Sequence, residues 1–149
     1  MAQFDADMGA IHGMIEDFKG LGERSEQVFK DMVNEGTGIL KDHIKEGASH
    51  HVQTGQMLRG IKKTKARYYA KEGAYIGEVK FTGSEGVYVT KSGKKYDITN
   101  WLKAYRIEYG TSKQQAKPFV RPAIDKATPQ ITSAWQERFN QEIKKCKNI

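Results

Sequence analysis

Residues 109–127 read Tyr-Gly-Thr-Ser-Lys-Gln-Gln-Ala-Lys-Pro-Phe-Val-Arg-Pro-Ala-Ile-Asp-Lys-Ala, and this is the most informative stretch of the chain. Gly110 permits a backbone turn that a side chain would resist. Pro118 favours an extended conformation in the residue before it, and Pro122 suits the first turn of a helix. The pattern predicts a strand over 104–109, a polar loop anchored by Phe119, and then a helix.

The same stretch carries a resemblance to a known family. Its Glu-Tyr-Gly-Thr, polar loop and Lys-Pro-Phe-Val-Arg-Pro-Ala are similar to the signature Glu-aromatic-Gly-Thr … Arg-Pro-Phe-aliphatic-Arg-Pro-Ala. That signature belongs to the head–tail joining proteins of tailed bacteriophages, also described as tail-completion, neck or minor tail-component proteins of lambda-like siphophages. Lys117 stands where Arg is more usual, which keeps the charge and loses the bidentate fork.

A second match lies upstream of the first. Thr54, Gly55, Leu58, Arg59 and Ile61 resemble the segment Thr-Gly-x-Leu-x-x-Ser-Ile that ends the first helical region of that family. This chain has an extra residue between the Gly and the Leu, and Gly60 replaces the usual Ser. The order and spacing of the two matches fit this family, so the resemblance spans about residues 10–145.

The resemblance implies a structural virion protein that joins the head connector to the tail by assembling as a ring, most simply a hexamer. The implied partners are the connector or adaptor protein on one side and the tail terminator or tail-tube protein on the other, with DNA passing through transiently. The protein would act in the neck of the virion after assembly in the host cytoplasm, without a cofactor. The closest alternative is the tail terminator of the same particle. Assembly contacts are expected at Glu108, Gly110, Thr111, Lys117, Phe119 and Arg121.

Length and composition predict one soluble domain over 1–149. The chain is 38% hydrophobic and 29% charged, and its 149 residues are enough for a sizeable core. Its one cysteine, Cys146, favours a reducing compartment because it has no partner within the chain. The N-terminus has neither the charge nor the apolar core of a signal peptide, and no apolar run approaches a membrane span.

The net charge of +7 is divided unevenly along the chain. Residues 1–56 hold 5 Lys and Arg against 10 Asp and Glu, whereas residues 57–110 hold 12 against 5 and residues 111–149 hold 8 against 3. An acidic first third and a basic remainder can pair head to tail between copies of one protein. Solvated surfaces that only maintain solubility are the alternative interpretation.

The first third, residues 1–47, is predicted to be helical. Apolar residues recur every three or four positions over 4–18 and again over 25–47, which is the pattern of amphipathic helices. Ser25 is a plausible cap for the second helix. Gly36 and Gly38 indicate either a bend in that helix or a close contact with another backbone.

The region 61–109 is predicted to form a small antiparallel sheet. Alternating apolar and polar residues around the turn Lys71-Glu72-Gly73 predict a hairpin of 62–70 with 74–82. Turns over 82–86 and 91–95 flank a short third strand, 87–89. Residues 98–103 are predicted to form one helical turn, capped by Thr99 or Asn100, before the strand 104–109.

The last region, 119–145, is predicted to be a long amphipathic helix that packs on the sheet. An apolar stripe runs from Ile124 to Ile143, and Pro129 inside it predicts a kink or a restart with Thr128 as the new cap. Strands in the middle with helical regions on both sides give an α+β fold.

Catalysis and metal binding find little support in the residue pattern. His43, His50 and His51 lie close together with Glu46, but neighbouring histidines point in different directions, so a polar loop is favoured over a metal site. Cys146 sits among lysines at the end of the chain, where a base and oxyanion donors cannot be held. The stretch 109–127 has one carboxylate and no His or Cys. We therefore expect no enzyme, no metal and no cofactor.

The alternative function is a basic nucleic-acid-binding module. Lys62, Lys63, Lys65 and Arg67 precede two tyrosines, and such interleaving lets cations neutralise phosphates while rings stack on bases. Tyrosines in a hairpin are equally typical of ordinary sheet packing.

Glu108 and Arg121 flank the loop 110–120, so an ion pair between them would hold its two ends together. Two independent surface charges are the alternative, worth at most ~1 kcal/mol. In a ring, Arg121 could instead reach a neighbouring subunit.

Overall fold

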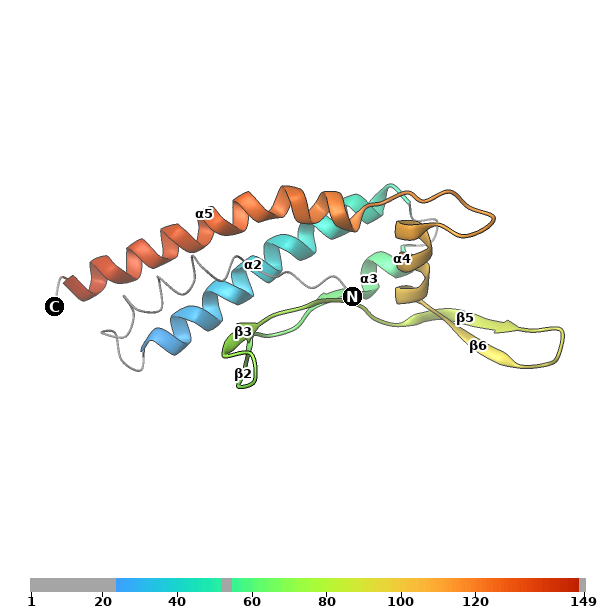
Figure 1. Cartoon of the computed structure of the whole chain (residues 1–149), viewed down its shortest axis with the longest axis horizontal. Helices are drawn as coiled ribbons and strands as arrows, with labels where there is room; N and C mark the ends of the chain where they lie inside the picture. Colours follow the sequence, from blue (N-terminus) through green and yellow to red (C-terminus); the bar gives the residue numbers. More distant parts are fainter. Residues whose placement is uncertain (1–23, 52–54, 148–149) are drawn as a thin grey trace.

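A computed structural model of the chain describes residues 24–51 and 55–147, so the helix predicted over 4–18 lies outside the described residues. Two long helices, α2 (Arg24–Ser49) and α5 (Val120–Lys147), lie side by side along the molecule (Figure 1). Between them in sequence come two short helices and three antiparallel two-stranded ribbons. The predicted α+β class is confirmed: an N-terminal helix, small antiparallel sheets and a long C-terminal helix.

The α2–α5 contact is the main packing of the molecule. Leu40 and Ile44 of α2 are buried with Ala127 and Ile131 of α5 in one core cluster, which the 3.6-residue period places on the facing sides of the two helices. The cluster continues at the N-terminus of α5, where Phe119 contacts Phe81 edge to face with ring centroids 6.0 Å apart.

Gly36 lies on the side of α2 that faces α5. A Cβ at this position would stand 2.9 Å from Ile131 Cγ2 and 3.0 Å from Trp135 Nε1, so the missing side chain makes room for both. The Trp135 indole N–H donates to the Met32 carbonyl across the same contact, at 2.6 Å. The predicted close contact with another backbone is wrong for Gly36, because the atoms that crowd it belong to side chains.

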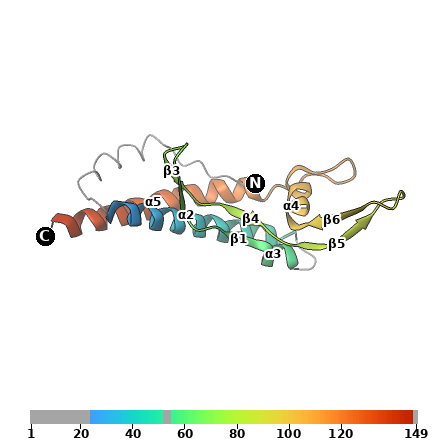
Figure 2. The same ribbon diagram turned by 90° about the horizontal axis from the view of Figure 1, so that it is seen from below.

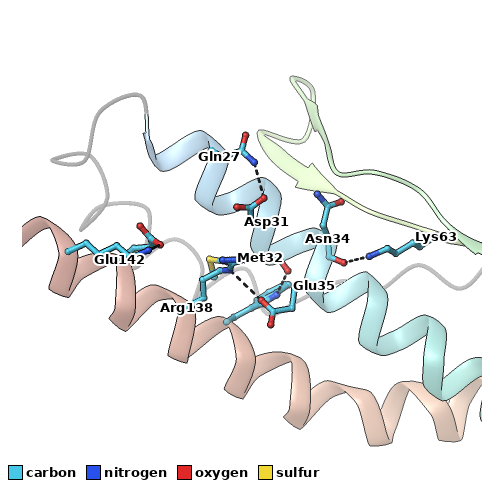
Figure 3. Close-up of polar contacts among 10 residues, drawn as sticks. Gln27, Asp31, Met32, Asn34, Glu35, Lys63, Arg138 and Glu142 are labelled. Atoms are coloured by element: carbon cyan, nitrogen blue, oxygen red, sulfur yellow. Dashed lines mark hydrogen bonds and ion pairs between the residues drawn. The ribbon is translucent and has the colours of Figure 1, made fainter.

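The predicted hairpin of 62–70 with 74–82 is present, but it is divided into two ribbons. Strands β1 (Ile61–Lys63) and β4 (Val79–Phe81) form the first, and β2 (Arg67–Tyr69) and β3 (Ala74–Ile76) form the second. The break lies where the hairpin passes α2. There the Asn34 side-chain oxygen accepts the Ala66 N–H at 2.8 Å, and Lys63 donates to the Asn34 carbonyl at 2.9 Å (Figure 3).

The third ribbon is an arm that extends from the body of the molecule (Figures 1 and 2). It consists of β5 (Ser84–Val89) and β6 (Lys95–Thr99), and Tyr88 pairs with Tyr96 across the two strands. The turn 91–95 is confirmed in position. The prediction missed β6, placed the start of β5 three residues too late, and expected one sheet where the described residues form three separate ribbons.

The predicted strand 104–109 is wrong, because these residues belong to helix α4 (Asn100–Tyr109). Thr99 caps this helix as predicted, since its side-chain oxygen accepts the Leu102 N–H at 3.1 Å. The helix then continues far beyond the single turn expected. A short helix, α3 (Gln56–Gly60), lies against it.

Helix α5 does not restart at Pro129. The helix runs through this residue, and the Thr128 hydroxyl donates to the Ile124 carbonyl at 2.8 Å, one turn back in the same helix. Thr128 is therefore not a cap, and that prediction is wrong. Pro122 does lie in the first turn, as expected.

Candidate assembly interface

Glu108 joins the end of α4 to the start of α5. Its carboxylate accepts three backbone N–H groups, those of Phe119 at 2.7 Å, Val120 at 2.9 Å and Arg121 at 3.2 Å. The first four N–H groups of a helix have no partner within it, and the fourth here belongs to Pro122, which has none to donate. Glu108 and Pro122 together therefore account for every unpaired donor at this helix end. A negative charge there also interacts favourably with the positive end of the helix dipole.

The predicted pairing of Glu108 with Arg121 occurs through the Arg121 backbone and not through its side chain. The Arg121 guanidinium lies 5.8 Å from the centroid of the Tyr109 ring, in a cation–π contact, and the residue is exposed. Glu108, by contrast, is buried. The two residues do hold the ends of the loop together, as expected, by a different contact from the one predicted.

The loop 110–118 is closed at its base. The Lys117 N–H donates to the Ile107 carbonyl across this base at 2.8 Å, and the Gly110 N–H donates to the Arg106 carbonyl in the last turn of α4, also at 2.8 Å. Gly110 has a φ of 76°, and a Cβ there would lie 2.7 Å from the Ala116 nitrogen, so only glycine fits without strain. Thr111 and Gln114 form a tight turn at the tip of the loop.

The six predicted contact residues therefore divide into two groups. Glu108 and Phe119 are buried and Gly110 is partly covered, so these three build the loop and the helix start. Thr111, Lys117 and Arg121 are exposed, so these three are placed where another molecule could touch them.

An exposed row of aromatic residues on α4 was missed by the sequence interpretation. Trp101, Tyr105 and Tyr109 are 45%, 47% and 56% exposed and stand four residues apart on one side of the helix. Their ring centroids are 5.4 Å and 4.7 Å apart, and Arg121 covers the last ring. We call the three aromatic residues the aromatic row. Exposed Trp, Tyr and Arg side chains are those that protein interfaces favour. The four-residue spacing could have revealed the row.

The histidines lie beside a shallow pocket of about 160 Å³ between the end of α2 and the start of α5. His43 Nε2 is 3.0 Å from the Gln130 side-chain oxygen, and the His51 ring faces Phe119 with centroids 6.1 Å apart. Among the described residues, no three His, Cys, Asp or Glu side chains are arranged to hold a metal ion.

The basic residues of the long hairpin are not equivalent. Lys62, Lys65 and Arg67 are exposed, whereas the Lys63 ammonium is bonded to the α2 backbone. Tyr68 is exposed, but its ring also contacts Tyr75, with centroids 5.2 Å apart. Partial burial raises the pKa of the Tyr75 hydroxyl above its ordinary value. Packing explains this tyrosine pair without any nucleic acid.

Within residues 24–51 and 55–147, no helix has both the length and the apolar character to cross a membrane. Comparison of the chain with protein-family models, with curated proteins and with solved structures finds no match in any of the three.

Proposed function

We propose that this protein is a structural virion protein that joins head to tail in a tailed phage or prophage, by forming a ring of copies at the tail side of the head connector. The observation that carries the proposal is the unit formed by Glu108, loop 110–118 and the start of α5. The residues that resemble the joining-protein signature lie together in this one unit. Three backbone N–H groups that donate to the Glu108 carboxylate stabilise its conformation.

The aromatic row supports a role in protein contacts. Exposed aromatic side chains next to an arginine lose ordered water and gain contact area when a partner covers them. Thr111, Lys117 and Arg121 lie on the same loop-and-helix unit and are open to solvent. Contacts of this kind, polar and aromatic with few aliphatic residues, are typical of subunits that are soluble before they assemble.

The proposal is tested by electron microscopy of phage particles made without this protein. The expected result is full heads and separate tails, because the two parts lack the ring that connects them. Heads that still carry firmly attached tails would exclude the joining role. Placement of the gene between those for a portal or adaptor protein and a tail-tube protein would add support.

A substitution at Arg121 separates assembly from folding. Arg121→Ala is expected to change the free energy of unfolding by less than ~1 kcal/mol, because the side chain is exposed. If Arg121 contacts a neighbouring subunit, its loss should weaken that contact by about 2 kcal/mol and lower the yield of joined particles. Chemical denaturation and particle counts measure the two effects.

Lys113→Ala is the matched control, since Lys113 is an exposed cation on the adjoining loop and outside the signature. Equal losses of joined particles for both variants would indicate a general effect of charge. If only the Arg121 variant unfolds, Arg121 stabilises the fold and its effect is not specific to assembly.

Nucleic-acid binding by Lys62, Lys65 and Arg67 is a second candidate function, favoured by the exposure of all three cations on one hairpin. A salt titration of DNA binding tests it, because each phosphate contact contributes about 0.9 to the slope of log affinity against log salt. We expect binding that is already lost at physiological salt if the joining role is correct. Tight binding that persists there and weakens only above it would favour the second function.

A further inference from the structure

We infer that the arm pairs edge to edge with the arm of a second copy of this chain, through β5, about a two-fold axis at Tyr88. The inference does not depend on the proposed virion role. It starts from the exposure of the arm: Val87, Tyr88 and Val89 of β5 and Tyr96 of β6 are each between 52% and 59% exposed. An isolated two-stranded ribbon is marginally stable in water, so such a ribbon gains from a further strand.

The backbone of β5 leaves one edge open. The Thr90 N–H donates to the Lys94 carbonyl, and Tyr88 pairs with Tyr96, so these residues bond inward to β6. Backbone groups alternate along an antiparallel strand, and those of Val87 and Val89 therefore point away from β6. No other described strand pairs with this edge.

The open edge lacks the features that usually protect such edges. Proteins commonly place Lys, Pro or inward charges on exposed edge strands to prevent pairing. Residues 86–90 of this chain read Gly-Val-Tyr-Val-Thr, with no charge and no proline. Valine, tyrosine and threonine are also residues that favour strands. A β-bulge interrupts the register only before Val87, so 87–89 is regular.

The strand is complementary to itself in the antiparallel direction. If Tyr88 lies opposite Tyr88 of the second copy, then Val87 lies opposite Val89 and both outward pairs form hydrogen bonds. The same arrangement brings Glu85, before this segment, toward Lys91 of the other copy, after it. Glu85 already contacts Lys103 in its own chain, so it would lie between two lysines.

A second copy fits this edge better than nucleic acid does. The tip of the arm is basic, with Lys91, Lys94 and Lys95, whereas between the tip and the body exposed apolar or aromatic side chains lie on both sides and Asp97 adds a negative charge that would repel phosphates. Phosphates would pair with the tip alone and would leave the backbone donors of β5 unpaired. Paired arms form a four-stranded sheet with Tyr96, Tyr88 and their copies in a row across one side. An interface of this small size predicts weak, concentration-dependent association.

Disulfide cross-linking tests the register. In a non-hydrogen-bonded antiparallel pair, the Cα atoms are about 4.5 Å apart, within the range of about 4.4–6.8 Å that a disulfide spans. Tyr88→Cys, in a protein with Cys146→Ser, is therefore expected to form covalent dimers under mild oxidation. Val87→Cys is the matched control: it is equally exposed, but its two copies would be more than about 7 Å apart. We expect cross-linking roughly tenfold faster for Tyr88→Cys.

A double variant that keeps Tyr88 controls for any effect of losing the tyrosine itself. Val87→Lys with Val89→Lys places lysines opposite one another across the axis while Tyr88 is kept. Sedimentation velocity at high protein concentration should then detect dimers for the native chain and fewer for this variant. Equal cross-linking of Tyr88→Cys and Val87→Cys, or unchanged sedimentation of the lysine variant, overturns the inference. Either result would leave the proposed virion role standing, because a ring can form without pairing of the arms. The two ideas can therefore fail separately.

Discussion

Replacement of Glu108 by alanine is expected to lower the free energy of unfolding by about 3–5 kcal/mol. The carboxylate is buried and accepts the N–H groups of Phe119, Val120 and Arg121, so its loss leaves three donors at a helix start without partners. The substitution also removes the negative charge that interacts favourably with the N-terminal end of the helix dipole. Urea denaturation followed by circular dichroism measures the change.

Two variants calibrate that result. Glu108→Gln keeps one acceptor oxygen and loses the charge, so we expect an intermediate loss of about 2 kcal/mol. Glu137→Ala removes an exposed carboxylate from α5 and should stay within ~0.5 kcal/mol of the native chain. If Glu108→Ala is no less stable than Glu137→Ala, the carboxylate does not hold the start of α5.

The second large effect is expected at Gly60, which lies where α3, the end of β4 and α4 meet. Its carbonyl accepts both the backbone N–H of Thr82 at 2.8 Å and the Thr82 hydroxyl at 3.0 Å. Asn100 is buried behind them and donates to the Thr82 carbonyl at 2.6 Å. A Cβ on Gly60 would overlap the Thr82 carbonyl oxygen and the Asn100 side-chain nitrogen.

Gly60→Ala should therefore destabilise the protein by about 3 kcal/mol, because the Cβ must displace backbone rather than a flexible side chain. Gly38→Ala is the matched control. In helix α2 a Cβ would meet only the end of Lys63, at 3.2 Å, and alanine is favoured over glycine in helices by about 1 kcal/mol. Thermal unfolding that ranks Gly38→Ala below Gly60→Ala in stability would contradict this description of the junction.

The sequence predicted the parts of the fold whose inward side is apolar. Helix α2 was predicted over 25–47 and runs from Arg24 to Ser49, and the long hairpin and the C-terminal helix lie where their patterns placed them. In the two long helices and in β4 the apolar residues recur with the period of the structure and lie inward, whereas β2 is exposed along its whole length. The fold class followed from these elements.

Helix α4 was missed because its pattern is reversed. Its buried residues are Asn100, Ala104 and Glu108, whereas its outer side carries the aromatic row. Two of the three inward residues are polar, and each is held by hydrogen bonds to segments far away in the sequence. Local propensity therefore favoured a strand for 104–109, since Tyr and Ile are common in strands, and the distant bonds decided otherwise.

The sequence predicted which residues belong to the candidate site, but it did not predict which groups contact one another. Glu108 and Arg121 were expected to meet through their side chains, but the position of the α5 N-terminus determines which groups Glu108 can reach. That position depends on how α5 packs along α2, which no local pattern reveals. The open edge of β5 was missed for a similar reason, since β6 was not predicted.

The closure of loop 110–118 at its base has a consequence for how such a protein can diversify. Bonds at Lys117 and Glu108 keep the two helices in place whatever the tip between them contains. Insertions and exchanges at residues 112–116 should therefore be tolerated, because lengthening a surface loop costs only about 0.6 kcal/mol for each doubling. The tip is thus a position where evolution, or an engineer, can alter which molecule is recognised while the scaffold stays the same.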